Sequence, residues 1–141
     1  RADAENPVVK EKMPVHAKRL QELAILVERN NECRSFHDIQ VLRIGDITIY
    51  TLPGELFVSS GKQIMTASSS PFPIVATLAN GDGAYIAPRR VFEAHPKIDS
   101  SDTWGTFGFY EIYCYPTAMR MKYADNVADI VINELLKMKP E

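Results

Sequence analysis

The fold of this chain is decided by residues 39–55, which read IQVLRIGDITIYTLPGE. Two runs rich in β-branched residues, 39–44 and 47–52, are separated only by Gly45-Asp46. Two residues of this type between two such runs predict a tight β-hairpin. Pro53-Gly54 then breaks the second strand, and Glu55 follows the break.

The residues that follow predict a helix and then a buried strand. Five residues share one helical face: Phe57, Gly61, Ile64, Met65 and Ser68. Glu55 would then lie in the first turn of this helix, where the helix dipole stabilises a charged carboxylate. The helix is expected to end at residues 68–71, which read SSSP. Residues 74–79 form a short continuous apolar run, which is typical of a strand buried on both faces.

Helices are also expected near the two ends of the chain. Apolar residues continue at helical spacing from Pro14 to Val27, and the pair Asn30-Asn31 supplies a stop. An amphipathic stripe predicts a C-terminal helix: Ala124, Val127, Ala128, Val131, Leu135 and Met138. Residues 93–109 are expected to be irregular.

These elements predict a layered α/β or mixed α+β fold, in which a sheet with a hairpin and a buried strand is packed by three helices. Residues 1–141 are expected to form a single unit, with residues 1–13 as a loose lead-in because they are polar and contain Pro7. The chain begins at Arg1 rather than at a Met, as we expect of a fragment or a processed chain. The two candidate metal ligands discussed below, a carboxylate and a phenol, are too few for a complete site, so the unit is predicted to be an incomplete domain.

Composition and charge exclude several kinds of partner. The content of 45% hydrophobic and 24% charged residues is typical of a globular protein. The net charge of −2 provides no broad basic field for nucleic acid or anionic lipid. The longest apolar stretches fall well short of the roughly 20 residues that a membrane span needs, so no transmembrane segment is expected. Cys33 and Cys114 offer no CxxC pair and are expected to be buried free thiols.

Glu55 and Tyr85 are the two candidate metal ligands. Each follows an apolar, strand-like run and lies where a strand gives way to a tighter structure. Residues 80–83, which read NGDG, tolerate unusual backbone angles. Both positions also have ordinary interpretations, Glu55 as a favourable first-turn residue and Tyr85 as an aromatic of the core or its rim. Position in the sequence does not decide between a metal ligand and these ordinary roles, because most loops at strand ends are simple turns.

The stretch from Ile39 to about Arg90 resembles the neutral (non-lysosomal) ceramidase family of zinc amidohydrolases. The features that match are, in order, Leu42-Arg43-Ile44-Gly45-Asp46, Leu52-Pro53-Gly54-Glu55, Ser70-Pro71-Phe72, Leu78-Ala79-Asn80-Gly81 and Tyr85-Ile86. The last helix, from Val127 to Leu136, is similar to the closing helix of the family in a looser way. The resemblance identifies this chain with the C-terminal part of the family's catalytic domain.

In that family, the Glu of a Pro-Gly-Glu motif and the second Tyr of an Asn-x-Tyr-x-x-Tyr motif are zinc ligands, together with two His residues from earlier in the chain. The resemblance therefore implies that Glu55 and Tyr85 bind Zn²⁺ in the intact parent protein. Asn80 aligns with the motif Asn, and Asp82 replaces the first motif Tyr. A downstream Tyr-Glu pair supplies an oxyanion-stabilising Tyr in the family. Tyr110-Glu111 is the matching pair here, although it lies farther from Tyr85 than in the family, and a structural role for Tyr110 is the alternative.

The resemblance implies that the parent hydrolyses an N-acyl amide with zinc-activated water, while fixed donors hold the developing oxyanion. The family's substrates are N-acyl sphingoid lipids, and its members are usually secreted or periplasmic. This chain has only His16, His37 and His95, none at a metal-binding spacing or at a family ligand position. All three are predicted to be ordinary surface or turn histidines. We therefore expect the chain alone neither to retain zinc nor to hydrolyse ceramide.

Three hypotheses follow from these observations. In the first, the chain is the C-terminal part of a ceramidase-like zinc amidohydrolase, and its partner is the N-terminal part of the same catalytic domain. In the second, it is a stand-alone α/β domain that acts in binding or assembly. In the third, it is an unrelated α/β domain in which both motifs are strand-end turns. The first predicts an exposed apolar surface or an unpaired strand edge, and self-association through it.

Overall fold

The computed structural model describes residues 5–12, 14–15, 17–18, 21–22, 25, 37–81, 83–95, 108, 110–114 and 123–138. The chain, expected to form a single unit, divides into two compact units. Unit 1 contains Arg1–Ser35 and Val91–Tyr123, and unit 2 contains Phe36–Arg90 and Ala124–Glu141. Both candidate metal ligands therefore belong to unit 2.

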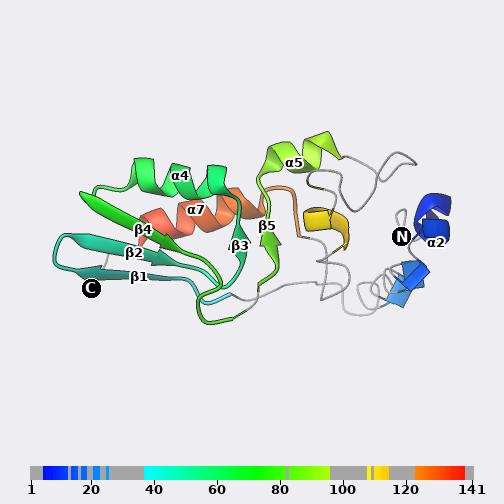
Figure 1. Cartoon of the computed structure of the whole chain (residues 1–141), viewed down its shortest axis with the longest axis horizontal. Coiled ribbons are helices and arrows are strands. Elements are labelled where there is room, and N and C mark those ends of the chain that lie inside the picture. Colours follow the sequence, from blue (N-terminus) through cyan, green and yellow to red (C-terminus); the bar gives the residue numbers. More distant parts are fainter. Residues whose placement is uncertain are drawn as a thin grey trace. The chain divides into compact units, whose positions relative to one another are not determined.

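Unit 2 is organised around a three-stranded sheet of order β1-β2-β4 (Figure 1). The predicted hairpin is confirmed, because β1 (Gln40–Ile44) and β2 (Ile47–Thr51) pair antiparallel. Gly45, at the turn, adopts a left-handed φ of 60°. β4 (Phe72–Ala76) pairs parallel with β2. Since a tight turn cannot join parallel strands, the chain crosses between them through the helix α4 (Val58–Ala67).

The helices α4 and α7 (Val127–Lys137) lie on one face of this sheet (Figure 1). The buried core that they share with the sheet consists of Val41, Tyr50, Leu52, Ile64, Ile86, Ala128, Ile132 and Leu135. The predicted C-terminal helix is confirmed, and α4 ends as predicted at Ser68, whose N–H donates to the Ile64 carbonyl. The two helices therefore cover one side of the sheet with their buried side chains, which are Ile64 of α4 and Ala128, Ile132 and Leu135 of α7.

The opposite face of the sheet is apolar and exposed. Six side chains form two rows across the paired strands, with Ile44, Ile47 and Phe72 in the first row and Leu42, Ile49 and Ile74 in the second. These six residues are called the apolar sheet face below. Ile44 exposes 66% and Phe72 61% of its surface. The prediction of a strand buried on both faces is therefore wrong for β4, because α4 and α7 cover only one side of the sheet.

The predicted loose lead-in contains a helix, α2 (Pro7–Lys12), in unit 1. Pro7 takes the first helical position, where the missing backbone N–H is not needed. The Asn6 side chain accepts a hydrogen bond from the Val8 N–H at 2.9 Å, as a helix-capping residue does. Val9 is fully buried. The proline that was interpreted as a sign of irregular chain thus starts a helix instead.

Other predictions for unit 1 are only partly covered by the described residues. Within the helix predicted from Pro14 to Val27, the described residues 14–15, 17–18, 21–22 and 25 are helical. The proposed stop at residues 30–31, together with His16 and Cys33, lies outside the described residues. The segment predicted to be irregular contains the end of α5 (Arg89–Ala94) and a π-helix, η1 (Tyr110–Cys114), follows it.

The predicted fold class is confirmed: the chain is a mixed α+β protein with a three-stranded sheet and helices. A search of the described residues finds no helix with the length and apolar character needed to cross a membrane.

The packing of α7 can be tested with two substitutions on the same helix. Leu135 is fully buried, so Leu135→Ala should lower the free energy of unfolding by about 2–5 kcal/mol through lost contacts and a residual cavity. Ile130 is 51% exposed, and Ile130→Ala should change it by no more than about 0.5 kcal/mol. Urea denaturation followed by circular dichroism measures both values. Equal losses for the two variants would contradict the observed orientation of α7.

Candidate functional site

Glu55 and Tyr85, thirty residues apart in the sequence, are direct partners across two short strands. β3 (Glu55–Leu56) and β5 (Tyr85–Ile86) pair parallel, with Glu55 opposite Tyr85 and Leu56 opposite Ile86. Neighbouring strands lie about 4.8 Å apart, and residues directly opposite each other point to the same face of a sheet. The carboxylate and the phenol therefore leave the backbone side by side, and both residues are half-buried.

This pairing corrects one sequence prediction. Glu55 lies in β3 rather than in the first turn of a helix, because α4 begins only at Val58 after Phe57. The helix-dipole argument for this carboxylate therefore does not apply. Its position is set instead by a hydrogen bond at 2.8 Å from the Glu55 N–H to the Ala84 carbonyl.

Backbone hydrogen bonds join the Pro-Gly-Glu turn to the loop between β4 and β5. The Pro53 carbonyl accepts from the Gly83 N–H at 2.7 Å, and the Gly54 carbonyl accepts from the Leu78 N–H at 3.3 Å. The Leu52 carbonyl also accepts from the Ala79 N–H at 3.0 Å. Since backbone groups buried without partners are costly, these bonds allow the turn and the loop to pack closely. The loop thus fixes the turn that carries Glu55 beside the strand that carries Tyr85.

Two glycines make this close packing possible. A Cβ atom on Gly54 would lie 2.6 Å from Ile86 Cδ1 and 2.8 Å from the Ala84 carbonyl oxygen. A Cβ atom on Gly83 would lie 3.1 Å from the Gly54 nitrogen and 3.2 Å from the Gly54 Cα. The motif glycine is therefore needed for the approach of the two chain segments rather than for an unusual backbone angle.

The loop that precedes Tyr85 contains strained backbone. Leu78, Asn80 and Ala84 have φ values of 55°, 63° and 60°, in the left-handed region. For residues other than glycine, this conformation costs about 1–2 kcal/mol, although asparagine tolerates it better. Ala84 is also the residue whose carbonyl binds the Glu55 N–H. Because strained backbone is concentrated at functional sites, this cluster supports a role for the loop beyond a simple turn.

Polar contacts hold the chain just after β5. Arg89 Nη1 lies 3.3 Å from Asp125 Oδ2, and Arg89 Nη2 lies 3.5 Å from Asp129 Oδ2. Arg90 Nη2 donates to Ser59 Oγ at 3.3 Å. These side chains are exposed, so each ion pair contributes at most about 1 kcal/mol. Their main effect is to fix the exit of β5 against the first turns of α4 and α7.

The other candidate residues have different surroundings. Tyr110, the proposed oxyanion donor, is half-buried in η1 and belongs to unit 1. The neighbouring Glu111 has a buried Oε2 atom with no hydrogen-bond partner among the described residues. His95 follows α5 and also belongs to unit 1, and Asp82 is not described. His37, predicted to be an ordinary surface or turn histidine, is half-buried and lies against Gly83 in unit 2.

Glu55 and Tyr85 fit part of a zinc site. A carboxylate is an ordinary zinc ligand, and a phenol adds a second oxygen on the same face of the β3–β5 pair. Structural and catalytic zinc sites use three or four protein ligands, so two donors are not enough. No group of three His, Cys, Asp or Glu side chains able to hold a metal is found among the described residues. A zinc site here would need further donors.

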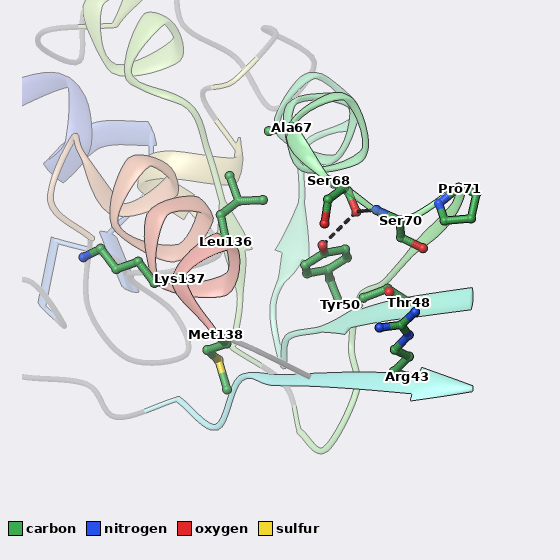
Figure 2. Close-up of a pocket in the computed structure, with 11 residues that line it drawn as sticks. Arg43, Thr48, Tyr50, Ala67, Ser68, Ser70, Pro71, Leu136, Lys137 and Met138 are labelled. Carbon is green, nitrogen blue, oxygen red and sulfur yellow. Dashed lines mark hydrogen bonds between the residues drawn. The ribbon is translucent and has the colours of Figure 1, made fainter. Parts of the chain in front are cut away.

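A pocket of about 350 Å³ lies at the C-terminal ends of α4 and α7, away from both candidate ligands (Figure 2). Figure 2 shows the Tyr50 hydroxyl directed at Ser68, and the two oxygens are 2.8 Å apart. Arg43 Nε donates a hydrogen bond to the Gly45 carbonyl at 3.0 Å. Lys137 is paired with Glu134 at 2.7 Å. The lining mixes apolar, hydroxyl and basic side chains, and its composition by itself does not indicate a ligand class.

No protein-family model, no curated protein and no solved structure matches this chain. The function is therefore inferred from the geometry around Glu55 and Tyr85 and from the motifs.

The need for glycine at position 54 gives a prediction about stability. Gly54→Ala should lower the free energy of unfolding by about 2 kcal/mol or more, because the new methyl group meets Ile86 and the Ala84 carbonyl. The control is Gly61→Ala in α4, where a Cβ atom would meet nothing within 4 Å. That variant should be stabilised by about 0.5–1 kcal/mol through helix propensity. Chemical denaturation of both variants measures the difference, and a neutral Gly54→Ala would contradict the close approach.

Proposed function

We propose that this chain is the C-terminal part of a ceramidase-like zinc amidohydrolase, and that Glu55 and Tyr85 are two of the zinc ligands. The observation that supports this proposal best is the pairing of Glu55 with Tyr85 across β3 and β5. The motif resemblance selected these two residues from positions thirty residues apart. A chance match to two unrelated turns would not require them to be neighbours on one face of a sheet.

The chain's own residues would have distinct roles at such a site. Glu55 would bind the metal through its carboxylate and neutralise part of the cation's charge, and Tyr85 would bind through its phenol oxygen. When bound, zinc supplies Lewis acidity, which lowers the pKa of a coordinated water and polarises the amide carbonyl. The hydrogen bond from the Glu55 N–H to Ala84 holds the carboxylate-bearing strand in place. We also propose that Tyr110 stabilises the developing oxyanion by donating a hydrogen bond from its hydroxyl.

The apolar sheet face supports the proposal that the chain is part of a larger catalytic domain. Sheets with parallel strands are usually covered on both faces, whereas α4 and α7 cover one face here. An open apolar hollow lies on the uncovered side and is lined by Ile44, Ile47, Phe72 and Ile74. We propose that the N-terminal part of the same domain covers this face and brings the histidine ligands. The substrate would be a lipid-like N-acyl amide.

The apolar sheet face also favours a second candidate function. A stand-alone domain that acts in binding or assembly would use the same exposed surface for a protein partner. In that case Glu55 and Tyr85 would have only structural roles, as turn and rim residues. The two functions therefore differ in the effect of the site residues on metal binding.

The zinc proposal is tested in the full-length parent protein. Glu55→Gln and Tyr85→Phe should each reduce zinc content, and each should lower the rate of amide hydrolysis by at least about 10–100-fold, because a direct metal donor is removed. The control is Glu134→Gln, which removes an exposed carboxylate of α7 and should leave both quantities unchanged. Zinc is measured by elemental analysis of the purified proteins.

Retention of zinc and activity in both site variants would contradict the proposal and favour an assembly domain. Loss of zinc with an unchanged unfolding transition would support it, because misfolding would then not explain the loss.

A second prediction concerns the apolar sheet face in the 141-residue chain. We expect this chain to self-associate, and Phe72→Glu to shift it to monomer by placing a charge on this face, where Phe72 exposes 61% of its surface. The control is Val58→Glu, at a residue of α4 that is 75% exposed but lies outside this face. Sedimentation velocity over a range of concentrations measures the association. A clean monomer at every concentration would instead favour the stand-alone domain.

A further inference from the structure

We propose that the pocket at the C-terminal ends of α4 and α7 binds a small organic carboxylate, with Arg43 and unused hydroxyl groups as donors (Figure 2). The inference does not depend on the proposed zinc function, because neither Glu55 nor Tyr85 lines this pocket. All of the lining residues belong to unit 2. The volume of about 350 Å³ is in the range of small-molecule sites.

The strand register builds one wall of the pocket. Arg43 of β1 lies directly opposite Thr48 of β2, and Tyr50 follows Thr48 by two residues. Residues in these relationships share a face of the sheet. Because Tyr50 belongs to the core beneath α4 and α7, all three side chains are on the face that the helices cover. Residues 68–71, which follow α4, and residues 136–138, at the end of α7, complete the pocket.

The Thr48 hydroxyl is an unused donor in this wall. Thr48 exposes only 5% of its surface, and its hydroxyl has no hydrogen-bond partner among the described residues. Buried polar groups are normally paired with protein or with ordered solvent. An unpaired hydroxyl in the wall of a pocket therefore indicates a ligand that accepts a hydrogen bond.

The Tyr50–Ser68 pair supplies a second unused donor. The two hydroxyl oxygens lie 2.8 Å apart, and Ser68 Oγ also accepts from the Ser70 N–H at 3.1 Å. Each hydroxyl carries one hydrogen, and only one of the two hydrogens can lie between the two oxygens. Whichever hydroxyl donates, the other keeps a hydrogen without an acceptor among the described residues. The pair thus offers one O–H to a ligand in either arrangement.

Arg43 gives the donor set a positive charge. Its Nε donates to the Gly45 carbonyl at 3.0 Å, and no described carboxylate pairs with the two Nη groups. No acidic residue is present among those that line the pocket. The fork of a guanidinium matches the two oxygens of a carboxylate. Lys137 is not assigned to the ligand, because its Nζ binds Glu134 Oε1 at 2.7 Å.

The other side of the pocket determines which part of the ligand it contacts. In Figure 2, Leu136 and Met138 lie across the pocket from the Tyr50–Ser68 pair. The C-terminal end of a helix carries partial negative charge, which disfavours an anion beside it. We therefore assign the carboxylate to the strand side, beside Arg43, and an apolar body of a few carbons to the side of Leu136. An inorganic anion would leave this apolar side without a partner.

The proposal is tested by titrating the ¹⁵N-labelled 141-residue chain with sodium hexanoate and following the amide shifts by NMR. Shifts should occur at Arg43, Thr48 and residues 68–70. Arg43→Gln should weaken binding by at least about 10-fold and the isosteric Thr48→Val by about 3–10-fold, because a charged and a neutral hydrogen bond are lost. The control is Arg89→Gln, which removes an exposed arginine of unit 2 outside the pocket and should leave the affinity unchanged.

Two further probes distinguish the parts of the ligand. Hexanol has the apolar body without the charge, and inorganic phosphate has the charge without the body. Weaker binding of both than of hexanoate supports the proposal. Equal binding of hexanol would overturn the role of Arg43, and equal binding of phosphate would overturn the apolar body.

The remaining outcomes also decide the inference. Dispersed amide spectra of the variants check that each is folded. No hexanoate shifts at any concentration, or equal weakening by Arg43→Gln and Arg89→Gln, would overturn the proposal. Neither result bears on the zinc content of the parent protein, which tests the proposed function separately.

Discussion

The site depends on the close contact between two backbone segments at Gly54 and Gly83. A Cβ atom at either position would meet backbone or buried side-chain atoms, at distances of 2.6–3.2 Å. This contact allows the Pro53 carbonyl and the Glu55 N–H to bond with the loop between β4 and β5. Glu55 is thereby held opposite Tyr85, and His37 occupies the space beside the glycines. A larger side chain at Gly54 would separate the two strands and move Glu55 away from Tyr85.

Two features raise the free energy of the folded chain: the strained loop before Tyr85 and the sheet face that no helix covers among the described residues. Left-handed backbone at Leu78 and Ala84 and the exposed apolar sheet face both raise its free energy. Neither feature is needed to build a stable hairpin packed by two helices. The strain shapes the loop before Tyr85, and the uncovered face offers a surface to a further layer. Under the proposed function, the rest of the catalytic domain would cover the apolar sheet face and remove its cost in free energy.

The hairpin, α4 and α7 were predictable because their signals are local. A two-residue turn between β-branched runs and a stripe of apolar residues at helical spacing are each contained within a short segment. The prediction of a doubly buried strand was wrong because the burial of a strand depends on residues distant in the sequence. The apolar run at residues 74–79 resembles a doubly buried strand, yet β4 lies at a sheet edge with one face exposed. A second prediction was wrong although its signal is local: Pro7 was interpreted as a sign of irregular chain, yet the adjacent residues Asn6 and Pro7 start α2.

For the site, the sequence by itself determined the residue types and the motifs that point to Glu55 and Tyr85. Local patterns also determined that each lies at the end of an apolar run. Only the tertiary structure decided that Glu55 is in a strand, that it pairs with Tyr85, and that His37 lies against Gly83. The reason is physical. Pairing across β3 and β5 arises from hydrogen bonds and glycine contacts between segments about thirty residues apart, and no local periodicity records such contacts.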